Sequence, residues 1–374
     1  MARSARHKRH IHESSVAEFR LVDCSGEKWS MLNSCDFDRK KAFFVKMVIV
    51  AASALVVIPF ALTLWLISLL SFTYYGFDGP FYPISPLRWL IAVCLPLYMS
   101  MDAIHKKKLD PLGAILAFVM GVIMTLSSYS HFLCLVAFFY TGSKLTRFRA
   151  SRKEELEEDY KEGGQRTWVQ VFTNGGIPAL YAAHFILETG FQDHPLDFSN
   201  YYNTTYIALG VMSGIACCSG DTWASEVGSV VGTQSPRLIT TLEKVPRGTN
   251  GGISLVGTLM SFAGGLVVGL GYLLGIFMTF SQDMLHNSPP QWPVVLFGGV
   301  AGLLGSLFDS LLGAWFQYSA YCTRQHKVVH QASPTTEHIS GIALFDNEGI
   351  NLLSCLLTVL IMPHICFTYW PQIS

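Results

Sequence analysis

Long apolar runs separated by short polar segments dominate the chain. A helix needs roughly 20 mainly apolar residues to cross the hydrocarbon core of a bilayer, and by that measure the pattern predicts about nine spanning helices. The candidate spans are 46–73, 87–104, 111–128, 130–143, 168–188, 203–220, 252–280, 293–316 and 352–369. The fifth span contains the polar motif TNGG, where we expect an interruption of the helix. The pattern therefore predicts an all-α fold, a multi-pass helical bundle in a membrane.

Basic residues cluster between alternate pairs of candidate spans. They occur in DRKK at 38–41, HKKK at 105–108 and KLTRFRASRK at 144–153, whereas the connections at 74–86 and 281–292 contain no Lys or Arg. Cytoplasmic loops of membrane proteins carry the excess of these residues. We therefore expect the N-terminus in the cytoplasm and the C-terminus on the outer side.

This topology divides the chain into two parts. Residues 1–45 are predicted to form a flexible basic cytoplasmic extension, and residues 46–374 the multi-pass domain, with cytoplasmic loops at 144–167, 221–251 and 317–351. The composition agrees with a membrane domain, since 51% of the residues are hydrophobic and only 14% are charged. A soluble domain is normally less apolar and more highly charged.

Two carboxylates follow the sixth candidate span, in SGDTWASEVG at 219–228. Ionisable groups at membrane depth are costly and usually functional. Mg²⁺ in phosphate-handling sites is bound by one or two carboxylates together with substrate phosphates. Asp221 and Glu226 therefore predict a magnesium site. The alternative is a structural one, in which Asp221 or Thr222 is the N-cap of a new helix.

A glycine-rich cationic loop, KVPRGTNGGIS at 244–254, precedes the seventh span. Backbone N–H groups at a helix N-terminus, exposed by glycine and flanked by cations, can bind phosphate. The residues predicted to bind phosphate are Lys244, Arg247, Gly248, Thr249, Asn250, Gly251 and Gly252. The alternative is an ordinary cytoplasmic turn whose cations follow the charge rule for membrane loops.

Other polar residues lie within or beside the apolar runs. Asp309 stands inside the eighth span, where a carboxylate needs a metal, a cation or a proton for compensation. Asn174, Asn347 and Asn351 are polar groups expected on or near the inner face. Each asparagine taken singly can instead bond a neighbouring helix.

Glycines recur through the seventh and eighth spans, in GTLMSFAGGLVVGLGYLLG and FGGVAGLLGSLFDSLLG. Small residues at such spacing allow helix backbones to approach closely in a membrane. We therefore predict that Gly265, Gly269, Gly271 and Gly275 are packing residues.

Four stretches together resemble the transmembrane protein 19 family, whose shared membrane domain also occurs in plant phytyl-phosphate kinase. They are KEGGQRTWVQVFTNGG, SGDTWASEVG, SPRLITTLEKVPRGTNGG and GSLFDSLLGAWFQY, within a resemblance that covers roughly residues 47–370. The plant relative implies phosphoryl transfer from a nucleoside triphosphate, CTP or another, to an isoprenoid monophosphate. The resemblance thus implies a transferase of lipid metabolism in the endoplasmic reticulum or another endomembrane.

The resemblance also suggests roles for the candidate residues. Asp221 and Glu226 would hold Mg²⁺, while the 244–252 loop would bind the nucleotide phosphates. Lys144 would neutralise the acceptor phosphate, and Asp309 and Asn351 would complete the coordination. The isoprenoid tail would lie among the glycine-rich spans.

A transporter or flippase for an anionic lipid or small anion is the alternative function. Such proteins bind charge at membrane depth with interrupted helices, and TNGG in the fifth span together with Asp309 fits that class. A scaffold without enzymatic activity is a third candidate. We expect the lipid bilayer as surroundings and no nucleic-acid partner, and the oligomeric state stays open.

Overall fold

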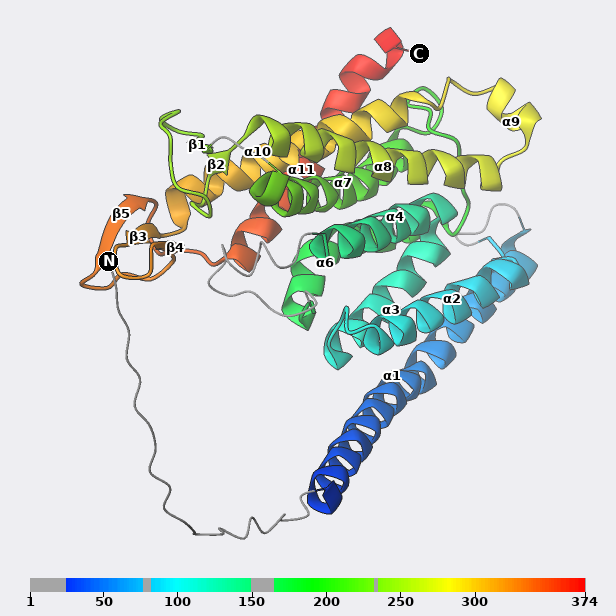
Figure 1. Cartoon of the computed structure of the whole chain (residues 1–374). Coiled ribbons are helices and arrows are strands. Elements are labelled where there is room, and N and C mark those ends of the chain that lie inside the picture. Colours follow the sequence, from blue (N-terminus) through cyan, green and yellow to red (C-terminus); the bar gives the residue numbers. More distant parts are fainter. Residues whose placement is uncertain (1–24, 77–81, 149–164, 232–234, 374) are drawn as a thin grey trace, which may run out of the picture. The chain divides into compact units, whose positions relative to one another are not determined.

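The computed structural model describes residues 25–76, 82–148, 165–231 and 235–373 (Figure 1). Contacts divide the chain into two units, Met1–Val45 and Lys46–Ser374. In the first unit, residues 25–45 belong to a helix. The predicted end of the extension at residue 45 coincides with this division, although its residues 25–45 are helical, and the remaining residues of the extension lie outside the described part of the chain. All of the following concerns the second unit.

Helices account for most of the second unit, and the first of them, α1, begins in the first unit. In chain order the helices are α1 Ser25–Tyr75, α2 Pro86–His105, α3 Pro111–Ser127, α4 Tyr129–Thr146, α6 Trp168–Thr189, α7 Tyr202–Val231, α8 Leu255–Thr279, α9 Gln282–His286, α10 Pro293–Phe316 and α11 Asn347–Ile373. Each candidate span falls on one of these helices. By length and apolar composition, five helices of the described chain qualify as membrane spans, namely α1, α2, α8, α10 and α11. The chain is a multi-pass helical membrane protein, and the number nine stays a prediction.

The boundaries of several helices follow from local capping. Asp110 accepts a hydrogen bond from Gly113 N at 2.6 Å at the start of α3. At the start of α6, Thr167 and Gln170 form a reciprocal capping box. Such bonds satisfy backbone N–H groups that have no partner within the helix. The polar residue in front of α3 and of α6 therefore fixes where each of these two helices begins.

Two of our expectations about helix continuity are wrong. Helix α6 runs without interruption from Trp168 to Thr189, so the TNGG motif lies inside a regular helix. Helix α7 continues past Asp221 to Val231, so Asp221 and Thr222 do not cap a new helix, and the loop expected from residue 221 starts after α7. Packing of both helices against neighbours outweighs the weak helix propensity of Gly and Asn.

Helix α7 forms the centre of the second unit. Every residue from Ile207 to Gly220 is buried, and α7 contacts α4, α6, α8, α10 and α11. A side chain at Gly220 would overlap the backbone of Gly302 in α10. Helix α7 is therefore enclosed on all sides, as expected for a helix with apolar or small residues around its circumference.

The glycines of α8 and α10 are packing residues, as predicted. A Cβ at Gly265 would overlap the carbonyl of Gly298, and one at Gly269 would overlap the backbone of Val295. On the other side of α8, Gly275 lies against the backbone of Ser130 in α4. The backbones of α8 and α10 thus touch, which leaves no room for a lipid tail between them. Our expectation that the tail lies there is not supported.

Contacts between the helix ends agree with the predicted alternation of sides. Leu109 and Arg166, both in segments predicted to lie inside, form a backbone bridge. Arg88 and Asp193, both near segments predicted to lie outside, form an ion pair at 2.8 Å. Segments assigned to the same side therefore meet each other, as an alternating topology requires.

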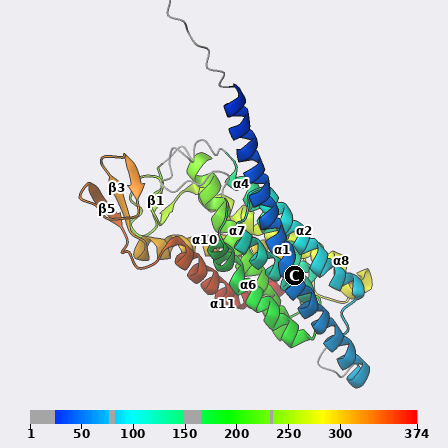
Figure 2. The same ribbon diagram turned by 90° about the horizontal axis from the view of Figure 1, so that it is seen from below.

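Two small antiparallel sheets lie in segments that we predicted only as cytoplasmic loops. Strands β1 Arg237–Leu238 and β2 Gly252–Ile253 form one, and β3 Ser319–Cys322, β4 Lys327–Val329 and β5 Thr336–Ser340 form the other, in the order β4-β3-β5. Figures 1 and 2 place strands of both sheets beside the same end of α10. The sheets give the inner loops a defined structure.

Candidate functional site

Three carboxylates lie toward the C-terminal ends of α7 and α10, which we predicted to face inward. Asp221 and Glu226 are on α7, and Asp309 is on α10. Asp221 lies close enough to Glu226 and to Asp309 to interact electrostatically with each of them. The structure therefore brings together three of the predicted residues from two helices that are far apart in the sequence.

Asp309 and Asp221 lack a compensating cation in the part of the chain that the structure describes. The only hydrogen bond to Asp309 there is a long one of 3.5 Å, from Ser354 Oγ of α11 to Asp309 Oδ2. Neither carboxylate forms an ion pair with a described Lys, Arg or His. Like charges held together away from bulk water disfavour one another unless a cation or proton compensates them. The carboxylate oxygens of Asp221 and Asp309 are donors that suit a divalent cation.

The carboxylates are better suited to an Mg²⁺ ion that is bound together with a phosphate than to a metal ion held by protein ligands alone. Among the described residues, no group of three or more His, Cys, Asp or Glu side chains is placed to hold a metal ion. Mg²⁺ usually keeps several water ligands and binds through one or two carboxylates and substrate phosphates. Asp221 and Asp309, with Glu226 beside Asp221, would supply the protein's share of such a site.

The glycine-rich loop packs directly onto α10 next to Asp309. Gly251 has a φ of +78°, and a Cβ there would overlap the Ser310 carbonyl and the Ala314 side chain. Asn250 N donates to Ser319 Oγ at 3.1 Å, which fastens the loop to β3. Only glycine fits this close, left-handed position without strain. The loop is thereby held against the helix that carries Asp309.

The loop offers fewer free backbone donors than we predicted. The N–H groups of Thr249 and Gly252 bond the carbonyls of Pro246 and Thr249, and Asn250 N is also occupied. Of the five residues from Gly248 to Gly252, only the two glycines at 248 and 251 have no hydrogen bond from the backbone N–H to described residues. The first turn of α8 is itself capped, since Gly257 N donates to Ser254 Oγ at 3.1 Å. A phosphate cradle built from the loop alone is therefore smaller than expected.

The two cations of the loop have different surroundings. Arg247 Nη1 donates to the carbonyl of Ser229 near the end of α7 at 3.1 Å, so this guanidinium ties the loop to the helix of Asp221. Lys244 is exposed. Among the predicted phosphate ligands, Lys244 has the greater freedom to reach a soluble nucleotide.

Lys144 lies in the last turn of α4 and is exposed. One turn earlier, Thr141 Oγ1 accepts a hydrogen bond from Trp223 Nε1 of α7 at 3.3 Å. Lys144 is thus near the inner end of α7, but no ion pair or hydrogen bond joins its side chain to the described residues. The structure does not place it at the carboxylates.

Arg166 is a residue that the sequence analysis did not single out. It precedes the capping box of α6, and its backbone bonds Lys108 O at 2.9 Å and Asp110 N at 3.0 Å. A Cβ at Gly142 would lie 3.1 Å from Arg166 Nη2 and 3.6 Å from the Thr222 methyl group. Because Gly142 of α4 has no side chain, the Arg166 guanidinium has room to approach α7 near Thr222, the residue that follows Asp221.

The charge of Arg166 lies near Glu226, and the residue is half-buried. Its guanidinium carbon lies 5.3 Å from the centre of the Phe138 ring. Burial lowers the pKa of Arg166 from its ordinary value, and the negative charge of Glu226 opposes that shift. An arginine stays protonated under such conditions. Arg166 is consequently a positive charge near Glu226, and a basic residue directly before a helix cap was the signal in the sequence.

The predicted asparagines occupy three different environments. Asn174 lies in α6, where its carbonyl accepts a bond from Cys218 Sγ of α7 at 3.1 Å. The carbonyl of Asn351 accepts a bond from Ser354 Oγ, the hydroxyl that also contacts Asp309. Asn347 is the first residue of α11 and is exposed. Asn174 and Asn351 are therefore near the site, whereas Asn347 is at its periphery.

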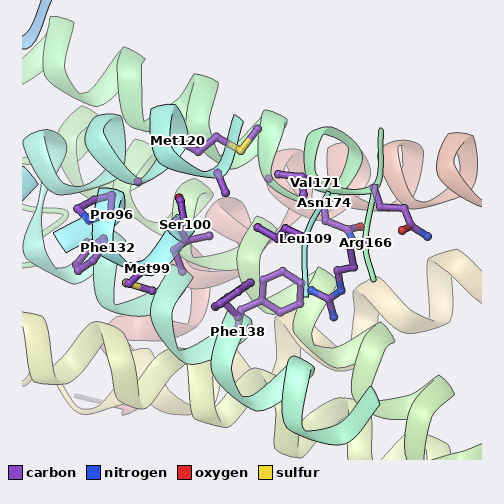
Figure 3. Close-up of a pocket in the computed structure, with 16 residues that line it drawn as sticks. Pro96, Met99, Ser100, Leu109, Met120, Phe132, Phe138, Arg166, Val171 and Asn174 are labelled. Atoms are coloured by element: carbon purple, nitrogen blue, oxygen red, sulfur yellow. The ribbon is translucent and has the colours of Figure 1, made fainter. Parts of the chain in front are cut away.

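A cavity adjoins Arg166 among α2, α3, α4 and α6 (Figure 3). Arg166, Gln170 and Asn174 contribute its polar groups together with Ser100 of α2, and the remaining lining is apolar. Arg166 thus lines an apolar cavity and also interacts electrostatically with Glu226. A ligand with an anionic head and an apolar tail matches this arrangement.

Comparison with known families identifies the domain. The family model described as "Integral membrane protein DUF92" matches residues 94–359. The chain belongs to the DUF92 family of integral membrane proteins. The matched region includes the three carboxylates Asp221, Glu226 and Asp309, the glycine-rich loop, Arg166 and the cavity. Helix α1 lies outside it.

Relatives of this DUF92 chain occur in plants and archaea. The chain is 39% identical to Protein PGR of Arabidopsis thaliana over 272 residues, which cover 72% of this chain and 93% of that protein. It is 29% identical to an uncharacterized membrane protein of Methanocaldococcus jannaschii over 242 residues, 64% of this chain and 88% of the other. With Protein VTE6, chloroplastic, of Arabidopsis thaliana it shares 29% identity over 208 residues, 55% of each chain. No solved structure matches the chain.

Proposed function

We propose that this DUF92 protein is a nucleotide-dependent isoprenoid-monophosphate kinase. The observation that carries the proposal is that Asp221 and Asp309 lie close enough to interact and have no cationic partner in the described chain, while Arg166 lies near Glu226. A phosphoryl-transfer site needs a divalent cation and basic groups for its phosphates, and little else from the protein. The sequence resemblance to a domain that occurs in plant phytyl-phosphate kinase supports the same activity.

The reaction makes one bond and breaks one. An oxygen of the acceptor monophosphate bonds to the γ-phosphorus of the nucleoside triphosphate, and the bond from that phosphorus to the β,γ-bridging oxygen breaks. The products are an isoprenoid diphosphate and a nucleoside diphosphate. A phosphate monoester has its second pKa near 6, so the attacking oxygen is already substantially ionised at neutral pH. The site therefore needs no strong general base.

Different residues of the chain would bind the metal ion and the nucleotide phosphates. Mg²⁺, when bound, would neutralise the charge that develops on the transferred group. Asp221 and Asp309 would hold it, with Glu226 nearby. Ser354 would support Asp309, because its hydroxyl contacts Asp309 and also bonds the Asn351 carbonyl. Lys244 and the free N–H groups of the glycine-rich loop would bind the nucleotide phosphates.

Arg166 replaces Lys144 as our first choice for the acceptor phosphate. Arg166 is half-buried and interacts with Glu226, whereas Lys144 is exposed and has no described partner. A guanidinium binds phosphate through two parallel hydrogen bonds, which also orients it. Lys144 would then contribute only to the general positive charge of the inner face.

The structure removes one observation that favoured a transporter. That function was suggested in part by an interrupted fifth span, but α6 is continuous through Asn174. Asp309 remains compatible with both functions, because both need a charge at membrane depth. The kinase therefore accounts for more of the site. The closer likeness to transmembrane protein 19, and a location in the endoplasmic reticulum or another endomembrane, remain predictions.

The test is a direct assay of phosphoryl transfer. Purified protein in detergent would be incubated with Mg²⁺, CTP or another labelled nucleoside triphosphate, and phytyl, farnesyl or geranylgeranyl monophosphate. We expect diphosphate from the wild type, loss of turnover by at least about a hundredfold in Asp221→Asn, and no product after removal of Mg²⁺ with a chelator. Asp283→Asn, an exposed residue of α9, is the matched control. Full turnover by Asp221→Asn would contradict the metal assignment, and no turnover by folded wild type would contradict the kinase.

A further inference from the structure

The cavity beside Arg166 extends along helix α4 into the apolar interior of the second unit. Its α4 lining includes Phe132 and Phe138, which are separated by six residues and therefore by about 9 Å of helix rise. In Figure 3, Phe132 and Arg166 lie toward opposite ends of the group of lining side chains. The cavity is thus elongated away from the charged end.

The chemistry of the lining changes along this length. Arg166 and Asn174 lie at one end, while Pro96, Met99 and Phe132 lie at the other (Figure 3). Ligand pockets combine mainly apolar walls with a few polar groups that fix the orientation of the ligand. This pocket would orient an amphipathic molecule with its anionic head at Arg166 and its apolar part toward Phe132.

Flexible side chains allow the wall to adapt to a branched tail. Met99 and Met120 both line the cavity, and the Met120 sulfur lies where a Cβ at Gly175 of α6 would come within 2.8 Å. Methionine fills irregular space because its chain is unbranched and polarizable. The absence of a side chain at Gly175 therefore leaves room for Met120 at the wall of the pocket.

We propose that this cavity binds the isoprenoid tail of the acceptor, while Arg166 binds the phosphate itself. The inference rests on the proposed kinase function, because that function supplies the lipid monophosphate. It replaces the glycine-rich spans as the tail site, since the backbones of α8 and α10 are in contact at Gly265 and Gly298. The same pocket would select acceptors by the length and shape of the tail.

Ala117 gives a way to fill the pocket without touching the carboxylates. It lies in α3 and lines the cavity, so Ala117→Phe would occupy the space intended for the tail. The control is Ala52→Phe, the same substitution at an exposed position of α1. We expect the KM for farnesyl monophosphate to rise about tenfold or more in Ala117→Phe. The KM for dimethylallyl monophosphate, which has only one isoprene unit, should change by less than about twofold in the same variant.

Two kinetic results would contradict the inference. An equal loss for both acceptors, in a protein that still binds nucleotide, would overturn the inference because tail length would then not matter. Unchanged KM values for both acceptors in Ala117→Phe would overturn it as well. Ala52→Phe should leave both constants unchanged.

A second measurement does not need turnover and separates this inference from the kinase proposal. A farnesyl monophosphate analogue with a photoreactive diazirine on its first isoprene unit would be crosslinked to the purified protein and the labelled peptides identified. We expect labels in α3 and α6, competition by farnesyl monophosphate, and loss of labelling in Ala117→Phe. Labelling confined to α8 and α10 would overturn the tail site. Labels in the pocket without diphosphate formation by the wild type would contradict the kinase and retain the lipid site.

Discussion

The Arg166 guanidinium carbon lies 5.3 Å from the centre of the Phe138 ring, and the same side chain interacts electrostatically with Glu226 of α7. A cation over an aromatic face is held in place while remaining charged. The pair thus fixes a positive charge between an apolar cavity and an acidic cluster. This position makes Arg166 the residue through which a lipid phosphate and the carboxylates would meet.

Loss of the Arg166 charge should weaken acceptor binding specifically. In Arg166→Gln we expect the KM for the isoprenoid monophosphate to rise by about tenfold to a hundredfold, the range for lost hydrogen bonds to a charged group, with the KM for nucleotide nearly unchanged. Arg166→Lys should recover only part of the loss, since an ammonium lacks the planar fork. Steady-state kinetics with each substrate varied in turn would measure both constants. Arg324→Gln, at an exposed position, is the control, and a rise confined to the nucleotide KM would reassign Arg166.

Gly248 and Gly251, the two glycines of the loop with a left-handed backbone conformation, should differ in how strongly their substitution affects the protein. Gly248 has a φ of +89°, and a Cβ there would meet only the Val328 side chain, at 3.6 Å, whereas a Cβ at Gly251 would overlap α10. Gly248→Ala should therefore cost about 1 kcal/mol from backbone strain alone, and Gly251→Ala clearly more. We expect a larger fall in Tm and a larger rise in nucleotide KM for Gly251→Ala. Equal effects of the two substitutions would mean that the contact with α10 does not position the loop.

The ion pair of Arg88 with Asp193 should stabilise the end of the bundle opposite the site. Both side chains are largely buried, with relative exposures of 10% and 9%, and Arg88 also donates to the carbonyl of Thr125 at 3.1 Å. Removing one partner of a buried pair costs about 3–5 kcal/mol. We expect Arg88→Leu to lower Tm substantially and Arg88→Leu combined with Asp193→Leu to lower it less. Thermal unfolding in detergent would show this, and additive losses would contradict the coupling.

The Arg88→Leu variant should also respond to pH. Burial raises the pKa of Asp193 above its ordinary value, and Arg88 opposes that shift, so removal of Arg88 should raise the pKa further. A carboxyl with a raised pKa in the folded state favours folding when protonated, and this contribution is lost as pH rises through that pKa. Lowering the pH from about 7 to about 5 should therefore stabilise Arg88→Leu relative to wild type. A Tm difference that does not change with pH would show that Asp193 is not the group left uncompensated.

The hydroxyl of Ser354 should tune Asp309 without being essential. Its bond to Asp309 is long, at 3.5 Å, and the hydroxyl also bonds the Asn351 carbonyl. Ser354→Ala should reduce kcat by about two- to tenfold, the range for one modest hydrogen bond, whereas Asp309→Asn should reduce it far more. Thr368→Ala, a hydroxyl that bonds the His364 carbonyl one turn earlier on the same helix, is the control. A full loss of turnover in Ser354→Ala would give that hydroxyl a direct role.

Much of the fold was determined by the sequence alone. Apolar runs and capping residues such as Asp110 and Thr167 act over a few neighbouring residues, so they locate helices without knowledge of the tertiary structure. The close packing of Gly265 was predictable for the same reason, because glycines at such spacing favour contact between helices. The continuity of α6 through Asn174 and of α7 through Asp221 was not predictable, since contacts with other helices override local propensity.

The candidate site, like the fold, was predictable from the sequence only in part. The sequence by itself indicated Asp221, Glu226 and Asp309, because a carboxylate in an apolar run is costly enough to signal a function. Only the tertiary structure decided that Asp221 and Asp309 lie close to each other, that Arg166 rather than Lys144 lies near Glu226, and that a cavity lies beside α4. These relationships join residues far apart in the chain, and their distances depend on how whole helices pack, which no local pattern of residues encodes.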